Sequence, residues 1–465
     1  MNAVLRNLGN LLIILSFFLL APIAISLYYG ENFLLFMITL IIALGAGIFL
    51  RKKFDDGILD LTKGLILATT SYILFSVIGA IPYRAALTTT NSLFESVSGF
   101  TTTGLTTIND LSEIPRSILF WRAETQWIGG IGIVLLFLFI ITYLSRPKKT
   151  DEYSASIETS SSLYKAAGFT EKIDSTVKKT TKRVINIYIL YTAIGIVLLA
   201  VSGIPLYESV TLSMTSISTG GFTASDISGY NNWALAVLCI MMILGSTSFF
   251  MHDKLLRGKM MYFLKKAETR TFASLIAISV LAALPFIKDV KIIIFQLISA
   301  FTTTGYSLTQ INTLPAILIA LICAGMFIGG NIASTAGGIK IFRFYVLVKA
   351  VPWIIKKIST PVTAIVPFKI EEGKVMDEED IILTQILFST FMFAIALATM
   401  TLMLLGHGFL DSAFQTISAI GTVGLQTMDI AASGALAKTA LIACMILGRL
   451  EIFPVLVLLR RLFTR

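Results

Sequence analysis

The sequence predicts an all-α polytopic membrane protein, in which four parallel membrane-pore-membrane repeats follow two extra N-terminal transmembrane helices. Of the 465 residues, 55% are hydrophobic and only 14% are charged, whereas soluble domains carry about 25% charged residues. Several apolar runs exceed the roughly 18 residues that indicate a transmembrane helix. A Thr/Gly-rich stretch also recurs four times between such runs. These observations exclude a large soluble core.

The two extra helices are expected at about residues 8–28 and 33–50. The first lacks a clear small-residue cleavage site and a second span follows it at once, so we expect a retained helix and not a signal peptide. Cys239, Cys323 and Cys444 lie within apolar runs without paired spacing. Their placement favours neither a disulfide framework nor a zinc site.

The repeat is visible in the sequence itself. Residues 94–105 read FESVSGFTTTGL, residues 295–306 read FQLISAFTTTGY, and residues 414–425 read FQTISAIGTVGL. Residues 207–222, YESVTLSMTSISTGGF, form a looser copy that reads as having four extra residues before the same ending. A repeat of this kind reports a repeated structural unit.

Each copy lies between two apolar spans, and the short segment before it is too short to cross a bilayer, which indicates a re-entrant helix. Every unit therefore starts and ends on the same side of the membrane, so four parallel units can surround one axis. The expected first spans are about 61–81, 184–204, 271–287 and 381–406, and the expected second spans are about 118–145, 233–252, 314–354 and 434–462. The resulting divisions are 1–53 for the extra helices, 54–150 for repeat 1, 151–258 for repeat 2 with a cytoplasmic loop, 259–357 for repeat 3 with an intramembrane gate loop, and 358–465 for repeat 4.

The Thr/Gly stretches suit a potassium filter, because rings of backbone carbonyls can replace the hydration shell of the ion. Irregular backbone at membrane depth is tolerated only beside protein or a water-filled cavity. Glycine reaches backbone angles that are closed to other residues, while the small Thr and Ser side chains hold the shape of the loop. The predicted potassium-binding residues, which act through backbone carbonyls, are Thr101, Thr102, Thr103, Gly104, Ser218, Thr219, Gly220, Gly221, Thr302, Thr303, Thr304, Gly305, Gly421, Thr422, Val423 and Gly424.

Two electrostatic features accompany the filters. The C-terminal end of each short helix carries about half a negative charge and points towards a filter. External carboxylates could attract cations further, although solvated loop or cap roles are the simpler interpretation. These carboxylates are Glu95, Asp110, Glu113, Glu208, Asp226, Asp411 and Asp429.

The net charge of +10 reports membrane topology. With a cytoplasmic N-terminus and ten crossings, most of the 37 Lys and Arg residues fall in cytoplasmic segments, as the positive-inside rule requires. We therefore expect a plasma (inner) membrane protein with both termini cytoplasmic and no nucleic-acid partner. The basic segments 146–183 and 253–270 either dock a regulator or only satisfy this rule.

The sequence resembles the Trk/Ktr/HKT superfamily of potassium transporters over nearly its whole length, and its Trk branch most. The resemblance rests on the four filters, on FWRAETQWIGGIGI, on GGNIASTAGGIKIFR and on ILGRLEIFPVLVL. It implies pseudo-fourfold symmetry of the repeats, a homodimer, and a cytoplasmic nucleotide-binding regulator of the TrkA type. The chain has no Rossmann glycine fingerprint, so a nucleotide (ATP/ADP or NAD) enters only through that partner. By resemblance, Gly104 in the first filter favours potassium over sodium, and the longer second filter departs from strict symmetry.

The apolar run 314–354 is too long for one span and is interrupted by GGNIASTAGGIK at 329–340, where four glycines disfavour a helix. The alternative is a helix kink or packing face, but the resemblance implies an intramembrane gate beneath the filter. Arg449 lies in the last apolar span, where we expect it to face the pore and bond to carbonyls of the gate loop, with snorkelling to the interface as the alternative. The predicted gate residues are Gly329, Gly330, Asn331, Ser334, Thr335, Gly337, Gly338, Lys340 and Arg449.

These patterns predict potassium uptake by a gated, channel-like subunit. The alternative is a proton- or sodium-coupled symporter, for which Glu451 is the strongest intramembrane carboxylate candidate. We expect no enzyme, because no nucleophile–base pair, metal cluster or phosphate loop stands in a plausible context. Potassium is the substrate, no covalent cofactor is expected, and membrane lipid surrounds the chain.

Overall fold

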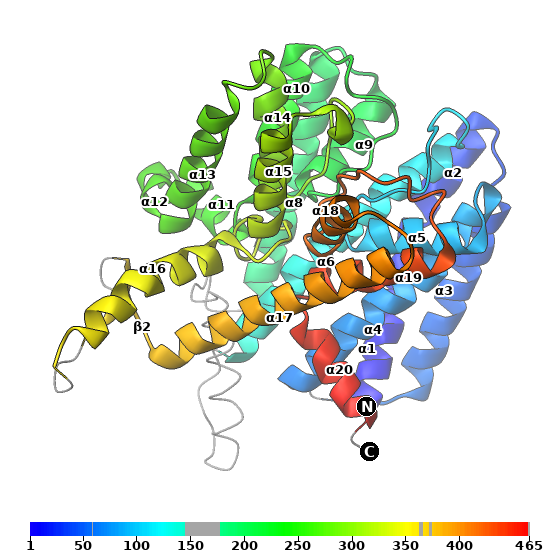
Figure 1. The fold of residues 1–465 in the computed structure, drawn as a ribbon. Coiled ribbons are helices and arrows are strands. Elements are labelled where there is room, and N and C mark those ends of the chain that lie inside the picture. The colour runs from blue at the N-terminus through cyan, green and yellow to red at the C-terminus, as the bar shows by residue number, and fades with distance from the viewer. Residues whose placement is uncertain (58, 145–176, 362–365, 372–373, 464–465) are drawn as a thin grey trace.

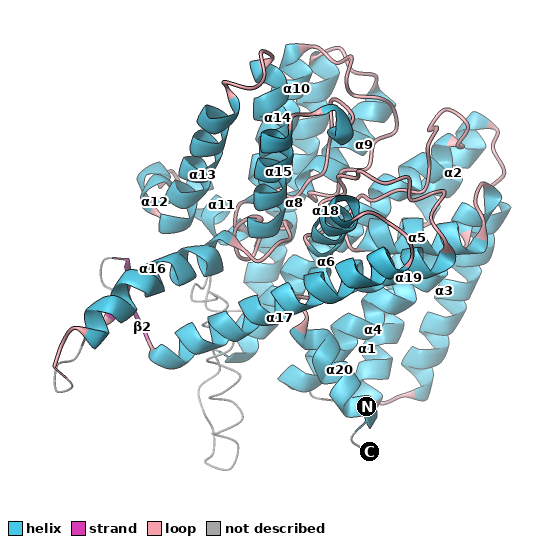
Figure 2. Cartoon of the chain, viewed as in Figure 1, coloured by secondary structure: helices cyan, strands magenta, loops and turns pink. Residues whose placement is uncertain are grey.

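The computed structural model describes all residues except 58, 145–176, 362–365, 372–373 and 464–465, and its described part is built almost entirely of helices (Figure 1 and Figure 2). By length and composition, five described helices could cross a membrane, or up to seven if each of two sharply bent helix pairs counts as one span. The all-α polytopic fold is thus confirmed. The start of the chain and its last described helix lie at the same end of the molecule (Figure 1).

The N-terminal helices form a layer beside the first unit. α1 (Asn2–Phe18) continues into α2 (Leu20–Tyr29), and α3 (Leu34–Lys53) packs back along α1. A Cβ atom added at Gly9 would meet the carbonyl oxygen of Gly47, and one added at Gly47 would meet that of Gly9. Small residues therefore let these two backbones approach closely, as is usual between membrane helices.

Each unit then places a short helix between two longer segments. The first segments are α4 (Leu61–Gly79), α8 (Val177–Val201), α13 (Ala267–Ala283) and α17 (Glu378–Leu404). The short helices are α5 (Thr89–Phe100), α9 (Leu206–Ile217), α14 (Val290–Phe301) and α18 (Phe409–Ile420). The second segments are α6 (Arg116–Leu144), α10 (Asn232–Ser246) with α11 (Phe249–Leu256), α15 (Ala316–Ile328) with α16 (Ile341–Ile358), and α19 (Ala435–Arg449) with α20 (Phe453–Phe463). The connecting elements are η1 (Pro82–Ala85), α12 (Met260–Lys265) and η3 (Ile311–Thr313).

The four short helices have the same length, 12 residues, and each ends just before its Thr/Gly stretch. The four extra residues expected in the second copy are therefore wrong. Glu208 lies in the first turn of α9, whereas Glu95 lies halfway along α5, so the YES and FES triplets are not equivalent. Aligned on the filter glycines, the second unit places Leu212 where the first has Glu95.

The second segments are interrupted more often than the sequence analysis expected. The break at 329–340 is confirmed, because α15 ends at Ile328 and α16 begins at Ile341. The continuous spans predicted at 233–252 and 434–462 are wrong, since the chain bends by 110° between α10 and α11 and by 108° between α19 and α20. At the second bend, Glu451 and Ile452 both adopt positive φ, which ends helical hydrogen bonding there.

A small antiparallel hairpin, β1 (Phe368–Glu371) and β2 (Lys374–Met376), was not predicted. Phe368, Ile370 and Met376 are buried against α16, and the Tyr345 hydroxyl donates to the Ile370 carbonyl at 2.9 Å. Alternation of apolar and charged residues in FKIE is the signal that could have found it. The hairpin thus holds the helix that follows the gate loop.

Glycines in three second segments bring those segments against the ends of the short helices. A Cβ at Gly129 would overlap the carbonyl of Phe100, and one at Gly448 would overlap that of Ile420. Gly245 stands in the same relation to Ile217. The same close approach in three units fixes the depth at which the first, second and fourth filters begin.

We predict that Gly448→Ala lowers stability by about 1–3 kcal/mol, the usual cost of overpacking a dense core. The thermal unfolding midpoint of the detergent-solubilised protein measures this effect. Gly45→Ala is the matched control, because a Cβ at Gly45 in α3 meets nothing within 4 Å. Equal midpoints for the two variants would contradict the prediction.

Candidate functional site

Each short helix ends in the same hydrogen-bonded turn. In the first unit, the Thr102 N–H donates to the Gly99 carbonyl and the Thr103 N–H to the Ser98 carbonyl, both at 2.9 Å. This pair of bonds defines a Schellman motif, in which the residue with left-handed backbone is usually glycine. Here that residue is threonine in every unit, with φ of 51°, 51°, 54° and 50° at Thr102, Thr219, Thr303 and Thr422. A β-branched residue in this region is strained, and such strain clusters at functional sites.

The four filter glycines close a ring. Gly104, Gly221, Gly305 and Gly424 all have positive φ, from 81° to 99°. A Cβ added to any of the first three glycines would overlap a carbonyl oxygen of the next unit, and one added to the fourth would overlap a carbonyl oxygen of the first unit. In the order of the glycines, these oxygens belong to Gly220, Thr304, Val423 and Thr103. The backbones of all sixteen predicted filter residues are therefore brought to one place in cyclic order, where the loops gather beside α18 (Figure 2).

Hydrogen bonds between side-chain hydroxyls stabilise the backbone of the filter stretches. Thr101 and Thr103 hydrogen-bond to each other at 2.8 Å, and Thr302 and Thr304 do so at 2.9 Å. Outside the ring, Gln126 on α6 donates to the Gly220 carbonyl at 2.6 Å and accepts from the Phe222 N–H at 3.1 Å. The sequence analysis missed Gln126, which ties the first unit to the second filter.

A buried ion pair links the outer ends of the first two filters. Arg122 on α6 and Glu95 on α5 are fully buried, with Nε and Oε2 3.1 Å apart. Glu95 also accepts from the Thr107 N–H at 2.5 Å, while Arg122 donates to the Thr223 carbonyl at 3.2 Å. Both earlier interpretations of Glu95, a solvated loop residue and an exposed cation attractor, are wrong, because its carboxylate is neutralised inside the protein.

Other acidic residues lie in exposed turns above the ring. Asp110 accepts from the Ser112 hydroxyl and N–H, and Asp226 does the same with Ser228. The hydrogen bonds from Ser112, its hydroxyl first, lower the pKa of the Asp110 carboxyl because they favour the charged form. These residues match the turn role expected for them.

The predicted gate loop, residues 329–340, is wholly buried. Its neck is closed, because the Lys340 N–H donates to the Ile328 carbonyl at 2.9 Å and the Ile341 N–H to the Gly330 carbonyl at 3.0 Å. The loop body reaches across the inner side of the filters. The Gly337 N–H donates to the Thr303 hydroxyl at 2.7 Å, which joins the loop to the turn beneath the third filter.

The same loop touches the second and fourth units. The Gly338 N–H donates to the Gly421 carbonyl at 3.1 Å. The Thr335 hydroxyl donates to the carbonyls of Ile217 and Gly245 at 2.9 and 2.8 Å. Asn331 and Ser334 lie in the same buried turn, where the Ser334 hydroxyl donates to the Asn331 carbonyl at 2.6 Å. The segment therefore lies directly beneath three of the four filters.

Arg449 connects this loop to the remaining unit. Its guanidinium donates to the Thr335 carbonyl at 2.6 Å and to the Gly129 carbonyl at 2.8 Å. The side chain is only 3% exposed, so it does not snorkel to the interface. The expected bond between Arg449 and the gate loop is thus confirmed.

The other predicted gate cation lies at the loop's exit. Lys340 immediately precedes α16 and has a φ of 84°, and its ammonium contacts the Ala336 carbonyl and lies 4.0 Å from Glu451. Glu451 forms its close ion pair with Arg343 on α16, a residue that the sequence analysis did not single out. Glu451 and Arg449 therefore have different hydrogen-bonding partners.

Comparison with known proteins agrees with this arrangement. The family model described as TrkH, cation transport protein, matches residues 29–288 and 287–463. The chain belongs to this family. It is 34% identical to an uncharacterized cation transporter of Methanocaldococcus jannaschii, and the match covers 99% of this chain and 96% of that relative. It is 29% identical to the Trk system potassium uptake protein TrkG of Escherichia coli, over 98% of this chain and 97% of TrkG.

The fold is also that of a solved member of the family. The potassium transporter TrkH from Vibrio parahaemolyticus superposes with a TM-score of 0.87 at 24% sequence identity, covering 100% of this chain and 99% of that one. This match supports the helical architecture described above.

We predict that Glu95→Gln destabilises the protein by about 3–5 kcal/mol, because Arg122 is left buried without its counter-ion. The unfolding free energy or thermal midpoint of the solubilised protein measures the loss. The control is the double variant Glu95→Gln with Arg122→Leu, since the corresponding positions of the fourth unit hold Gln415 and Leu441. The double variant should recover most of the stability; a loss equal to that of the single variant would contradict the pair's role.

Proposed function

We propose that this protein takes up potassium across the plasma membrane as a gated, channel-like subunit. The observation that carries the proposal is the closed ring of four filter glycines with a buried loop beneath it. Backbone carbonyls at such a ring are the ligands that replace the hydration shell of potassium. The relative TrkG, named a potassium uptake protein, and the family's role in cation transport support the choice of ion.

The electrostatics of the ring favour a cation. The four short helices end at the filters, and the C-terminal end of each helix dipole places partial negative charge there. Glu95, buried beside the outer end of the first filter, is paired with Arg122, so this ion pair adds no net charge at the filter. Carbonyl dipoles suit selection among monovalent cations better than a ring of full charges does.

We further propose that residues 329–340 and Arg449 form the gate. The loop lies beneath three filters and Arg449 binds both the loop and the first unit, so together they obstruct the route below the ring. Arg449 also places a positive charge in a low-dielectric site on that route, which opposes a passing cation. Opening then requires the loss of the Thr335–Arg449 bond.

The Trk resemblance also underlies three proposals about assembly. We propose a homodimer, a TrkA-type nucleotide-binding regulator on the cytoplasmic side, and cytoplasmic termini. Val348, Val351 and Ile355 on α16 are exposed and apolar, so lipid or a second copy would cover them. Most of the basic segment 146–183 lies outside the described residues, and 253–270 remains a candidate docking segment.

We predict that the purified protein in liposomes carries rubidium-86 down its gradient, with no dependence on a pH or sodium gradient. Glu451, the residue expected to couple protons, is engaged by Arg343, which leaves it poorly suited to carry a proton. The flux is measured with and without each gradient. Obligatory proton or sodium movement would establish the symporter instead. Gly104→Ser is the filter control, because its Cβ would overlap the Gly220 carbonyl, and it should lower the rubidium-to-sodium flux ratio.

For the gate, we predict that deleting residues 331–336 raises basal flux. The deletion joins Gly330 to Gly337, and these residues already lie close together, since the Gly330 N and the Gly337 carbonyl oxygen are 3.4 Å apart. Arg449→Ala should also raise single-channel conductance, because it removes the charge below the ring, while Arg461→Ala on the exposed end of α20 should leave it unchanged. Unchanged flux in a well-folded deletion variant, or unchanged conductance in Arg449→Ala, would exclude this gate.

A further inference from the structure

A cavity of about 570 Å³ lies beside the first unit, and none of the four filter glycines lines it. It is walled by α1, α4, α6 and α8, and its inner end reaches Phe100 at the base of the first filter. The volume falls within the roughly 300–1,000 Å³ of pockets that hold small organic ligands. Gly129 and Gly132 on α6 and Ala68 on α4 line it, so small residues leave the space that larger ones would fill.

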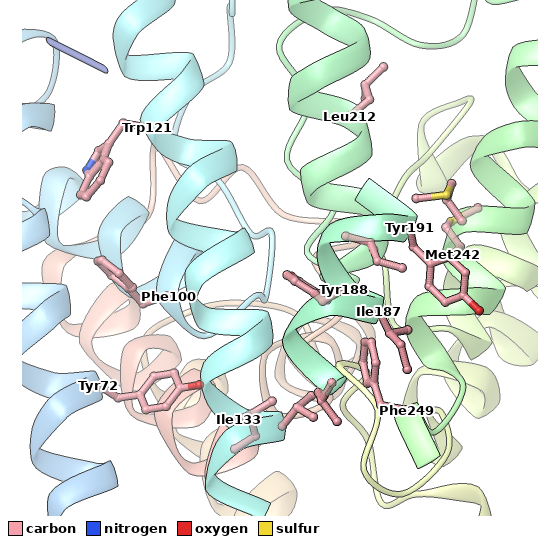
Figure 3. Close-up of a cluster of buried hydrophobic side chains, with 14 of the residues drawn as sticks. Tyr72, Phe100, Trp121, Ile133, Ile187, Tyr188, Tyr191, Leu212, Met242 and Phe249 are labelled. Carbon is pink, nitrogen blue, oxygen red and sulfur yellow. The ribbon is translucent and has the colours of Figure 1, made fainter. Parts of the chain in front are cut away.

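The chemistry of the wall is that of a hydrocarbon site. Ser71 and Tyr72 supply its side-chain hydroxyls, and both are already engaged. The Ser71 hydroxyl donates to the Leu67 carbonyl at 2.6 Å, and the Tyr72 hydroxyl crosses to α6 and donates to the Gly129 carbonyl at 2.8 Å (Figure 3). A cavity that offers water so few polar partners stays dry, so water is a poor occupant.

The cavity also reaches the outer surface of the helices. Ile14 on α1 and Ile189 on α8 both line it, yet they are 51% and 48% exposed. Phe17, one helical turn from Ile14, and Leu190, next to Ile189, are exposed apolar residues as well. In a membrane protein such a surface meets lipid tails, which are the apolar molecules present at high concentration on that side.

We propose that this cavity binds one acyl chain of a membrane phospholipid, which enters between α1 and α8 and packs against Tyr72 and Phe100. A chain bound there fills a space that would otherwise leave its walls without contacts. The inner end of the cavity is linked to the proposed gate through a single carbonyl group. The Gly129 carbonyl accepts hydrogen bonds from both Tyr72, which lines the cavity, and Arg449. The site therefore places a lipid next to the contact that joins the first unit to the gate loop.

The test is photolabelling of the full-length protein in liposomes that contain a phospholipid with a diazirine in its acyl chain. Adducts mapped by mass spectrometry should concentrate on cavity-lining residues such as Leu15, Ala68 and Ile131. Ala68→Phe fills the cavity and should reduce these adducts about tenfold, the change that about 1.4 kcal/mol of binding free energy produces. Ala396→Phe on the exposed face of α17 is the matched control and should leave them unchanged.

Leu11→Trp fills the same cavity from α1 and replaces Ala68→Phe if that variant does not elute as a monodisperse protein. Equal labelling of the cavity in wild type and in a folded filled variant would overturn the proposal. So would labelling of α17 as strong as that of the cavity wall. The measurement does not depend on ion flux, so its failure is distinguishable from a failure of the proposed potassium transport.

Discussion

The close approach of each filter glycine to a carbonyl of the next unit is the constraint on which the rest of the molecule depends. A side chain at Gly104, Gly221, Gly305 or Gly424 would force the backbone to shift, because its Cβ would overlap a carbonyl of the adjoining unit. The ring closes only if all four loops lie at the same depth and follow the same path. Equal 12-residue helices, identical Schellman turns and the packing glycines of the second segments all meet this demand.

The strained threonines follow from the same constraint. A glycine at the left-handed position would relax the turn, yet Thr102, Thr219, Thr303 and Thr422 occupy it. Threonine there keeps a hydroxyl on the inner side of the filter, and two of the four are used by the gate loop. Thr303 accepts from Gly337, and Thr219 lies 3.3 Å from the Thr335 hydroxyl. The backbone strain is thus compatible with a role for these hydroxyls in joining filter and gate.

Much of this could be predicted from the sequence because it depends on local patterns. Apolar length predicts the helices, the repeated T-x-G stretches predict the filters, and four glycines in twelve residues predict the break at 329–340. The failures involve partners far apart in sequence. Glu95 is interpreted from the sequence as an external carboxylate, and nothing in the local sequence shows that Arg122, 27 residues later, would neutralise it. The similarity of YES to FES hid the true register of the second unit, which is set by the distance to Gly221. The bends at Thr247 and Glu451 lack the glycine run that marked the third unit.

The four units are alike at the ring of filter glycines and different beneath it, and the pore that we propose requires both properties. A carbonyl ring needs equivalent contributions, so every unit ends its short helix in the same way. The space below the ring has room for one loop, so only one of the four units can place a loop there. The third unit provides the long loop, the fourth contributes Arg449 at its bend, and the first keeps α6 helical through Gly129, whose carbonyl Arg449 uses. Covalent linkage of four diverged repeats allows this division, which four identical subunits around one axis could not achieve.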